Sequence, residues 1–202
     1  MESDMYNTRA KFIKTLVPAS DTLFESDSML NVLKNENDFI LEKISKQPKE
    51  QRWRRIFIRS LFAFIETLCF RLKQDALEFN KFSSAEESIL NEKTYVLNNK
   101  GEVEAKVLFL KTPENLRFSF NAFAKAVEAK FVLKVDDVGW DSFKQSLKVR
   151  HKITHPKKFN DLVISDDEFQ KVISTMHWIY GQTIRLFDAW RNFQEELQKN
   201  KK

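Results

Sequence analysis

Glycine and proline are scarce in this chain, which has three glycines and four prolines among its 202 residues. Sheets of many strands depend on these two residue types for their tight turns, so a sandwich or a barrel is disfavoured. Nineteen phenylalanines and four tryptophans supply a bulky aromatic core, and a hydrophobic content of 42% suffices for a single domain. We therefore predict a mainly all-α fold in the form of a helical bundle.

The longest apolar pattern with helical spacing lies between residues 51 and 79. Apolar residues cover nearly the whole circumference of this segment, which predicts a buried central helix. The core stripe consists of Trp53, Ile56, Phe57, Leu61, Phe64, Leu68 and Leu72. Further periodic segments predict helices near 113–131, 140–154 and 166–197.

The chain is expected to form one compact domain in two parts. Residues 1–48 form an N-terminal helical extension, with one or two short helices that end at Gln47-Pro48. Residues 49–202 form the bundle. Ser165 with Glu168 three residues later is a capping-box pattern, which predicts the start of the last long helix.

One segment has the pattern of strands and not of helices. Two short apolar runs, Thr94–Leu97 and Val103–Leu110, flank the sequence Asn98-Asn99-Lys100-Gly101. Gly101 readily adopts the positive φ that a tight turn at this place requires. We predict a small β-hairpin inserted into the bundle, and the residues around Gly101 suggest no function for it.

The use of cysteine fits a reducing compartment, and the hydropathy pattern bears on targeting and membrane insertion. The single Cys69 excludes an intramolecular disulfide and a cysteine-rich zinc site. The first ten residues are polar and lack the apolar stretch of a signal peptide. Ile56–Phe70 is apolar but short, and it contains Arg59 and Glu66, so it favours a core helix over a membrane span. We expect a cytoplasmic protein without a membrane partner.

A cation and two imidazoles stand together in the sequence Arg150-His151-Lys152-Ile153-Thr154-His155-Pro156. Pro156 disfavours the helical conformation at His155 and marks the end of the helix. On a helix, His151 and His155 lie one turn apart on the same face. Arg150 lies about 140° around the axis from His155, so these two converge only if the last turn unwinds or a second copy approaches.

The order of elements around this motif resembles the HEPN superfamily. A bulky central helix is followed by a helix that ends in Arg-His-x3-His-Pro-Lys, a short linker, and a long helix that opens at Ile164-Ser165-Asp166-Asp167. The resemblance covers about residues 50–197. It implies a helical bundle that is often dimeric and that in many members is a metal-independent endoribonuclease with an Arg-x4–6-His signature and a polar residue after the arginine.

In that resemblance, Arg150 and His155 match the signature pair, and His151 fills the polar position after the arginine. One toxin subgroup has a tyrosine two residues after the histidine. Lys157 stands at that place here, so control by modification of such a tyrosine is not expected.

The implied chemistry assigns a role to each residue of the motif. Cleavage of RNA without a metal uses the 2′-hydroxyl as nucleophile and needs a base, an acid and a cation. His155 is expected to transfer protons, Arg150 to stabilise the phosphate, and His151 to orient substrate or share the proton transfer. The carbonyl end of the helix favours the imidazolium form of His155. Thr154 is a further candidate for a hydrogen bond to a phosphate oxygen.

Lysines surround the motif and favour a polyanionic partner. They are Lys148, Lys152, Lys157 and Lys158, and no acidic residue lies between Lys148 and Asn160. With a net charge of +5, the chain is compatible with RNA as a partner, bound in a salt-dependent way.

The motif of one copy supplies few catalytic groups, so a homodimer is expected. Neither a metal nor another cofactor is required.

Other charged residues near the motif allow two interpretations each. Glu66 in the apolar central helix either orients Arg150 or a histidine, or it lies at a solvent edge or pairs with Arg59. The arginines at the start of that helix form either a solvated face or an extension of the RNA-binding surface. They are Arg52, Arg54, Arg55 and Arg59.

Two hypotheses for the function follow. The first is an endoribonuclease of the HEPN type in defence, in a stress response or in a toxin–antitoxin pair, with an antitoxin or another protein as a further partner. The second is a non-catalytic helical module that binds RNA, a nucleotide or a protein. The sequence contains no Gly-rich phosphate loop, no His-Glu-x-x-His and no Gly-x-Ser-x-Gly, so P-loop, zinc-protease and serine-hydrolase chemistry are set aside.

Overall fold

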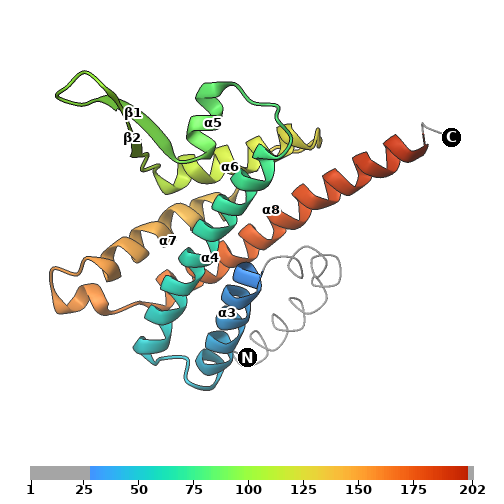
Figure 1. Cartoon of the computed structure of the whole chain (residues 1–202). Helices are drawn as coiled ribbons and strands as arrows, with labels where there is room; N and C mark the ends of the chain where they lie inside the picture. The colour runs from blue at the N-terminus through green and yellow to red at the C-terminus, as the bar shows by residue number, and fades with distance from the viewer. Residues whose placement is uncertain (1–27, 200–202) are drawn as a thin grey trace. The chain divides into compact units, whose positions relative to one another are not determined.

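The computed structural model describes residues 28–199, so residues 1–27 of the expected N-terminal extension lie outside the described part. Within residues 28–199, the chain forms six α-helices, one short 3-10 helix and one antiparallel hairpin (Figure 1). In chain order the elements are α3 (Ser28–Lys46), α4 (Gln51–Leu77), α5 (Ser84–Leu90), β1 (Lys93–Leu97), β2 (Val103–Val107), α6 (Thr112–Ala126), α7 (Val138–Thr154), η1 (Phe159–Leu162) and α8 (Asp166–Lys199). The prediction of a mainly α fold with a β-hairpin insertion is confirmed.

The described residues divide into two compact units. We call residues 28–67 and 134–184 the motif unit, because they include the Arg-His motif. We call residues 68–133 and 185–199 the hairpin unit. Helices α4 and α8 each belong partly to the motif unit and partly to the hairpin unit.

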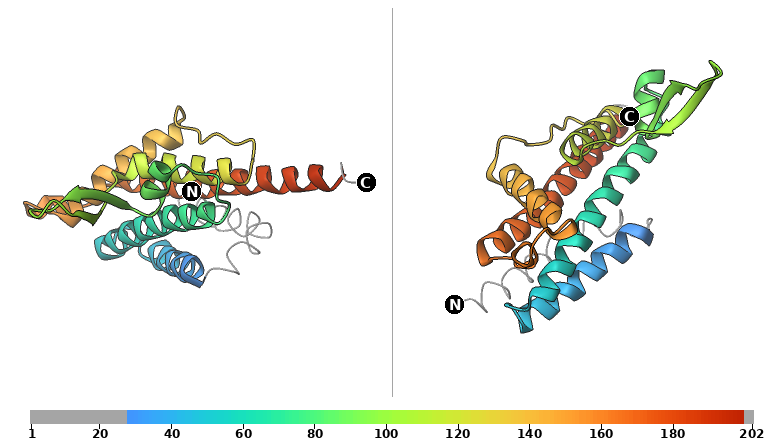
Figure 2. Two further views of the ribbon diagram at one scale, coloured as in Figure 1. Left: turned by 45° about the horizontal axis from the view of Figure 1, so that its top comes forward. Right: turned by 90° about the vertical axis from the view of Figure 1, so that its left-hand side faces the viewer.

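The motif unit has an aromatic core formed by α4, α7 and α8. The rings of Phe57 and Phe169 meet edge to face with centroids 5.9 Å apart, and those of Phe62 and Phe143 stack at 6.3 Å. Helix α3 runs beside the first part of α4 (Figure 2). Each such buried ring contributes about 1.5–3 kcal/mol relative to an exposed one.

Helix α4 is buried on nearly all sides, as its sequence predicts. Its almost fully buried residues in this unit are Phe57, Ile58, Leu61, Phe62, Phe64 and Ile65. None of the helices in residues 28–199 has both the length and the apolar character that crossing a membrane demands.

Helix α7 begins at Val138, two residues before the expected start. The Asp137 carboxylate accepts hydrogen bonds from the backbone N–H of Trp140 at 2.8 Å and from the Trp178 indole N–H at 3.2 Å. Gly139 lies in the first turn directly against the Trp178 ring, where a Cβ atom would stand 2.0 Å from ring atom Cδ1. The close approach of Trp178 therefore requires a glycine here.

In the hairpin unit, β1 pairs with β2 in an antiparallel register that places Tyr95 opposite Ala105 and Leu97 opposite Val103. Gly101 has the predicted positive φ, at 77°. The second strand was predicted to reach Leu110, and this is wrong because β2 ends at Val107. The residues after β2 leave the ladder and lead into α6, which has proline in its first turn.

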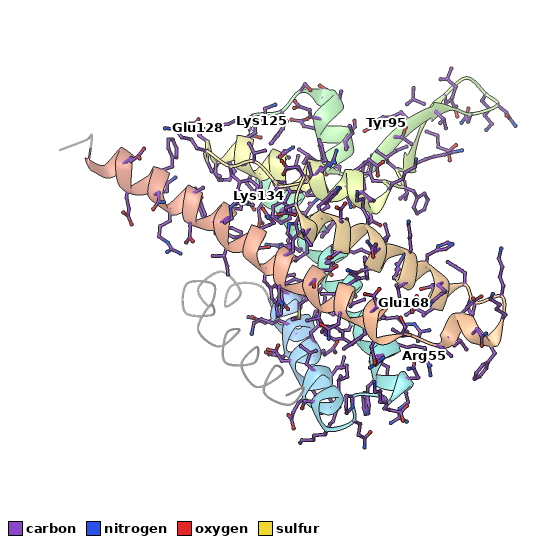
Figure 3. The ribbon with its side chains drawn as sticks, turned by 180° about the vertical axis from the view of Figure 1, so that it is seen from behind. Arg55, Tyr95, Lys125, Glu128, Lys134 and Glu168 are labelled. Atoms are coloured by element: carbon purple, nitrogen blue, oxygen red, sulfur yellow. The ribbon has the colours of Figure 1, made fainter. Side chains whose placement is uncertain are left out.

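The predicted end of α6 near residue 131 is also wrong, because the helix ends at Ala126. Glu128 adopts a left-handed conformation with φ 57°. Ala129 N–H donates to the Ala124 carbonyl at 3.0 Å and Glu128 N–H to the Lys125 carbonyl at 3.3 Å. These two bonds form a Schellman motif, in which glycine usually takes the left-handed position. The helix end, with Lys125 and Glu128 labelled, is visible in Figure 3.

A fully buried lysine connects three segments of the hairpin unit. Lys73 on α4 has an exposed fraction of 0%. Its ammonium donates to Glu92 Oε1 at 2.6 Å and to Asn115 Oδ1 at 2.9 Å. A buried charge is tolerated only when paired and hydrogen-bonded, and both conditions hold here.

Candidate functional site

The candidate site lies at the C-terminal end of α7 in the motif unit. The helix ends at Thr154, and His155 follows as its C-cap with φ −125° and ψ 60°. The His155 backbone N–H still donates to the His151 carbonyl at 3.0 Å. Pro156 therefore ends the helix at the predicted place, and the last turn remains wound.

His151 and His155 form a pair of exposed imidazoles. Their ring centroids are 5.1 Å apart and their planes differ by 54°. Both side chains face solvent. Their one-turn spacing on α7 places them on the same face, as the motif predicts.

Arg150 is held in place by two residues of α4. Its Nη2 atom donates to Glu66 Oε1 at 2.9 Å, and its guanidinium carbon lies 5.9 Å from the centroid of the Phe62 ring. The side chains of Arg150 and Glu66 are 33% and 48% exposed. The structure thus brings Glu66 to Arg150, in accordance with the first interpretation of this carboxylate. An ion pair this exposed adds little stability, so its main effect is on the orientation of Arg150.

Arg150 and His155 do not converge within one copy of the chain. The turn between them is intact, since His155 N–H is bonded to the His151 carbonyl. Five residues of α-helix separate positions by about 7.5 Å along the axis. Of the two routes to convergence, unwinding is absent from this structure, which leaves approach by a second copy.

Two of the candidate RNA-binding residues are already engaged in the fold. The Thr154 hydroxyl donates to the Arg150 carbonyl at 2.7 Å, so only its oxygen lone pairs remain available. Lys152 donates to Glu168 Oε1 at 2.5 Å and to the Val163 carbonyl at 3.2 Å. These bonds link the end of α7 to the start of α8.

Glu168 belongs to the predicted capping box of α8. Its backbone N–H donates to Ser165 Oγ at 3.2 Å, and its Oε2 accepts the Ser165 N–H at 2.9 Å. Burial favours a raised pKa of the Glu168 carboxyl, but hydrogen bonds from Lys152 and Ser165 outweigh it and hold the pKa below the usual value. The capping-box prediction is confirmed.

The remaining lysines of the candidate surface are open to solvent. Lys148, Lys157 and Lys158 are exposed, and their side chains form no ion pair with any described residue. The backbone N–H groups of Lys157 and Lys158 donate to Asp161 Oδ2 at 2.8 and 3.1 Å. These amide bonds help to hold the pKa of the Asp161 carboxyl below its ordinary range. The linker backbone is thereby fixed while its lysine side chains stay available.

Three arginines of α4 hold the last turn of α7 and the linker that leads from it to α8. Arg59 donates to the Ile153 carbonyl at 3.0 Å and Arg55 to the Leu162 carbonyl at 2.9 Å. Arg54 is 3% exposed and donates to the Ile164 carbonyl at 2.9 Å. Figure 3 shows Arg55 and Glu168 at the same end of this unit.

For Arg54, these contacts exclude both interpretations of the basic helix start. Arg54 is neither solvated nor open to RNA, since Asp166 Oδ1 accepts a further bond from it at 2.7 Å. Arg52 stays exposed, with its guanidinium carbon 5.0 Å from the centroid of the Trp53 ring. The charge pattern alone does not distinguish these positions.

Phe159 is a further residue of this surface that the sequence patterns do not single out. It lies in η1 directly after Lys157 and Lys158, and 80% of it is exposed. An aromatic ring beside free lysines is the composition of a surface that stacks the bases of single-stranded nucleic acid. The only sequence signal is its position between two polar stretches of the linker.

The described residues contain no cluster of three or more His, Cys, Asp or Glu that could hold a metal ion. Comparison with known proteins finds no matching protein family, no similar curated protein and no similar solved structure. The chemistry of this site therefore has to be argued from its own residues.

Proposed function

We propose that this protein is a metal-independent endoribonuclease of the HEPN type, with its active site at the C-terminal end of α7. The observation that carries the proposal is the pair of exposed imidazoles at 5.1 Å at the end of the same helix as an arginine that Glu66 orients. An imidazole titrates near neutral pH and serves as acid or base. A guanidinium binds a phosphate through a planar pair of N–H donors.

The proposed reaction is an internal transfer at phosphorus. The ribose 2′-oxygen forms a bond to phosphorus as the bond from phosphorus to the 5′-oxygen breaks. A base takes the proton of the 2′-hydroxyl, and an acid gives a proton to the departing 5′-oxygen. The products are a 2′,3′-cyclic phosphate and a 5′-hydroxyl.

His155 and His151 are the candidates for proton transfer, and Arg150 for stabilising the charge on the phosphorus oxygens. The Glu66 carboxylate would fix the direction of the Arg150 guanidinium before substrate arrives. Lys148, Lys157 and Lys158 would attract the RNA backbone. Lys152 and Thr154 would contribute less, because their donors are engaged within the fold.

The separation of Arg150 from His155 on an intact helix supports a homodimer. In such a dimer, the arginine of one copy and the histidine of the other share one phosphate across a two-fold axis. We propose this arrangement for the active form. RNA cleavage in defence, in a stress response or in a toxin–antitoxin pair is the corresponding biological setting, in the cytoplasm.

The second candidate function is a non-catalytic module that binds RNA through the same surface. The observation in its favour is that Glu66 already occupies Arg150, while Lys157, Lys158 and Phe159 stand open on the linker. Such a surface binds RNA by charge and stacking without any proton transfer.

One experiment separates the two functions. Purified protein is incubated with varied single-stranded RNAs in the presence of EDTA, and both cleavage and binding are measured. The ribonuclease yields fragments that end in a cyclic phosphate, and the His155→Ala variant binds RNA but does not cut it. Binding without cleavage of any RNA by the unaltered protein would select the non-catalytic module.

A further inference from the structure

One face of the β-hairpin is apolar and open to solvent. Lys93, opposite Val107, stands at one end of this face, and the other residues of the face are Tyr95, Leu97, Val103, Ala105 and Val107. Their four large side chains are between 56% and 72% exposed. A two-stranded hairpin is marginally stable on its own, and an apolar face on it usually contacts another element. In the views of Figures 1 and 2 the hairpin projects away from α5 and α6 of its own unit.

The outer edge of β2 has open backbone groups. Asn98 N–H donates to the Glu102 carbonyl at 3.0 Å and Leu108 N–H to the Glu92 carbonyl at 2.7 Å. In an antiparallel ladder, hydrogen-bonded pairs alternate with pairs that are not. The even-numbered residues of β2 therefore bond to β1, and the N–H and C=O groups of Val103, Ala105 and Val107 point away from it.

This edge is also uncovered. All residues of β2 are exposed, whereas β1 follows α5 directly and contacts it. Proteins commonly protect such an edge with proline, a bulge or a covering segment. Residues Val103–Val107 contain no proline, and their register with β1 runs without a bulge.

The sequence of β2 is complementary to itself. In an antiparallel pair of two β2 strands centred on Ala105, Glu104 of each copy stands opposite Lys106 of the other, and Val103 stands opposite Val107. Opposite charges in this position stabilise a sheet and like charges destabilise it. Within one copy, neither Glu104 nor Lys106 has an ion-pair partner among the described residues.

We infer that β2 pairs with β2 of a second copy of this chain and forms a continuous four-stranded sheet. The register that matches the charges also matches the backbone, because Val103, Ala105 and Val107 are the residues whose N–H and C=O groups are open. The two apolar faces come to lie next to one another on one side of the sheet. This contact is separate from the two-fold contact proposed at the end of α7, and it does not rest on the ribonuclease function.

The charges give a direct test of this pairing. Sedimentation equilibrium of the full chain over about 1–200 µM measures the dimer dissociation constant. The unaltered chain is expected to dimerise, and Glu104→Lys or Lys106→Glu alone to weaken the dimer by roughly tenfold or more. An equimolar mixture of the two variants is expected to form a heterodimer, since every lysine then faces a glutamate.

Two further variants separate edge pairing from other contacts. Ala105→Pro removes an N–H that points away from β1, so it keeps the hairpin and abolishes association through β2, while the contact proposed at the end of α7 persists. Leu97→Ser alters the apolar face on β1, away from the paired edge, and leaves the dimer intact. Circular dichroism checks that each variant keeps the helical content of the unaltered chain.

Several results would overturn the inference. One is a monomer for the unaltered chain across the whole concentration range. Another is a dissociation constant that the charge reversals and Ala105→Pro all leave unchanged, which would mean that β2 takes no part and that the chain associates elsewhere, for example only at the end of α7. Loss of the dimer with Leu97→Ser alone would mean that the apolar faces stack. None of these readouts depends on RNA cleavage, so the ribonuclease proposal is tested separately.

Discussion

The carboxylate of Glu66 on α4 lies 2.9 Å from the guanidinium of Arg150 on α7. Glu66 stands in the central helix, most of whose residues are buried or half-buried, yet it reaches the motif and not the core. Because the pair is open to solvent, it adds little to the stability of the fold, and its effect is to orient the Arg150 side chain.

We expect Glu66→Gln to lower the rate of RNA cleavage by roughly tenfold, because an arginine without a fixed direction stabilises the transition state less well. The free energy of unfolding should change by less than about 1 kcal/mol. Single-turnover cleavage and urea denaturation measure the two quantities. Asp141→Asn, which removes the exposed pair with Lys144 on the same helix, is the matched control and should leave the rate unchanged. An equal effect of both variants would contradict a specific role for Glu66.

Lys157→Ala is expected to weaken RNA binding modestly and to reduce the slope of log K against log salt by about 0.7–0.9, the value of one phosphate contact. The reason is that this exposed ammonium acts through its charge alone. Fluorescence anisotropy at several salt concentrations measures both effects. Lys144→Ala serves as control, because Lys144 is also on the surface of the motif unit but is paired with Asp141 at 2.8 Å. A salt slope that falls equally for both variants would mean that the linker has no special part in binding.

Local sequence patterns predicted the features that depend on neighbouring residues. Pro156 marked the end of α7, Gly101 the turn of the hairpin, and Ser165 with Glu168 the start of α8. Each of these is set by backbone geometry within a few positions, so a single sequence is enough to recognise it.

Features that depend on distant partners were missed. Arg54 was part of a basic pattern that indicated a surface, but its partners are a carbonyl and a carboxylate more than one hundred positions away. The end of α6 was placed too late because Glu128 takes a left-handed conformation that glycine would have signalled. The fully buried Lys73 gave no signal at all, since its partners Glu92 and Asn115 come together only in the fold.

Lys73→Ala is expected to destabilise the protein by about 3 kcal/mol, because it removes a fully buried side chain with its hydrogen bonds to Glu92 and Asn115 and leaves a cavity. Lys73→Met keeps most of the side-chain volume without the charge and should cost less. Guanidinium denaturation followed by circular dichroism compares the two. If both variants lost the same stability, the loss of the charged contacts and not the cavity would explain the effect of Lys73, and the predicted difference between the variants would be wrong.

Acid should weaken the contact between α7 and α8 through Glu168. Hydrogen bonds from Lys152 and Ser165 hold the folded-state pKa of this carboxyl below its usual value of 4.5. The resulting stability is fully present above the unfolded-state pKa near 4.5 and is lost as the pH falls through the lower folded value. Glu168→Gln should therefore flatten the pH dependence of unfolding below about pH 4.5. If Glu168→Gln left the pH dependence of unfolding on the acid side unchanged, the result would contradict this assignment.

The central claim is that Arg150 and His155 cut RNA without a metal ion. The most direct measurement is cleavage of a single-stranded RNA in EDTA, with the fragment ends identified by mass spectrometry and a DNA of the same sequence as control. The account predicts 2′,3′-cyclic phosphate ends, no cleavage of DNA, and a rate lower by about 10²-fold or more for His155→Ala and for Arg150→Ala. Undiminished cleavage by both variants, or cleavage that stops when EDTA is added, would contradict it.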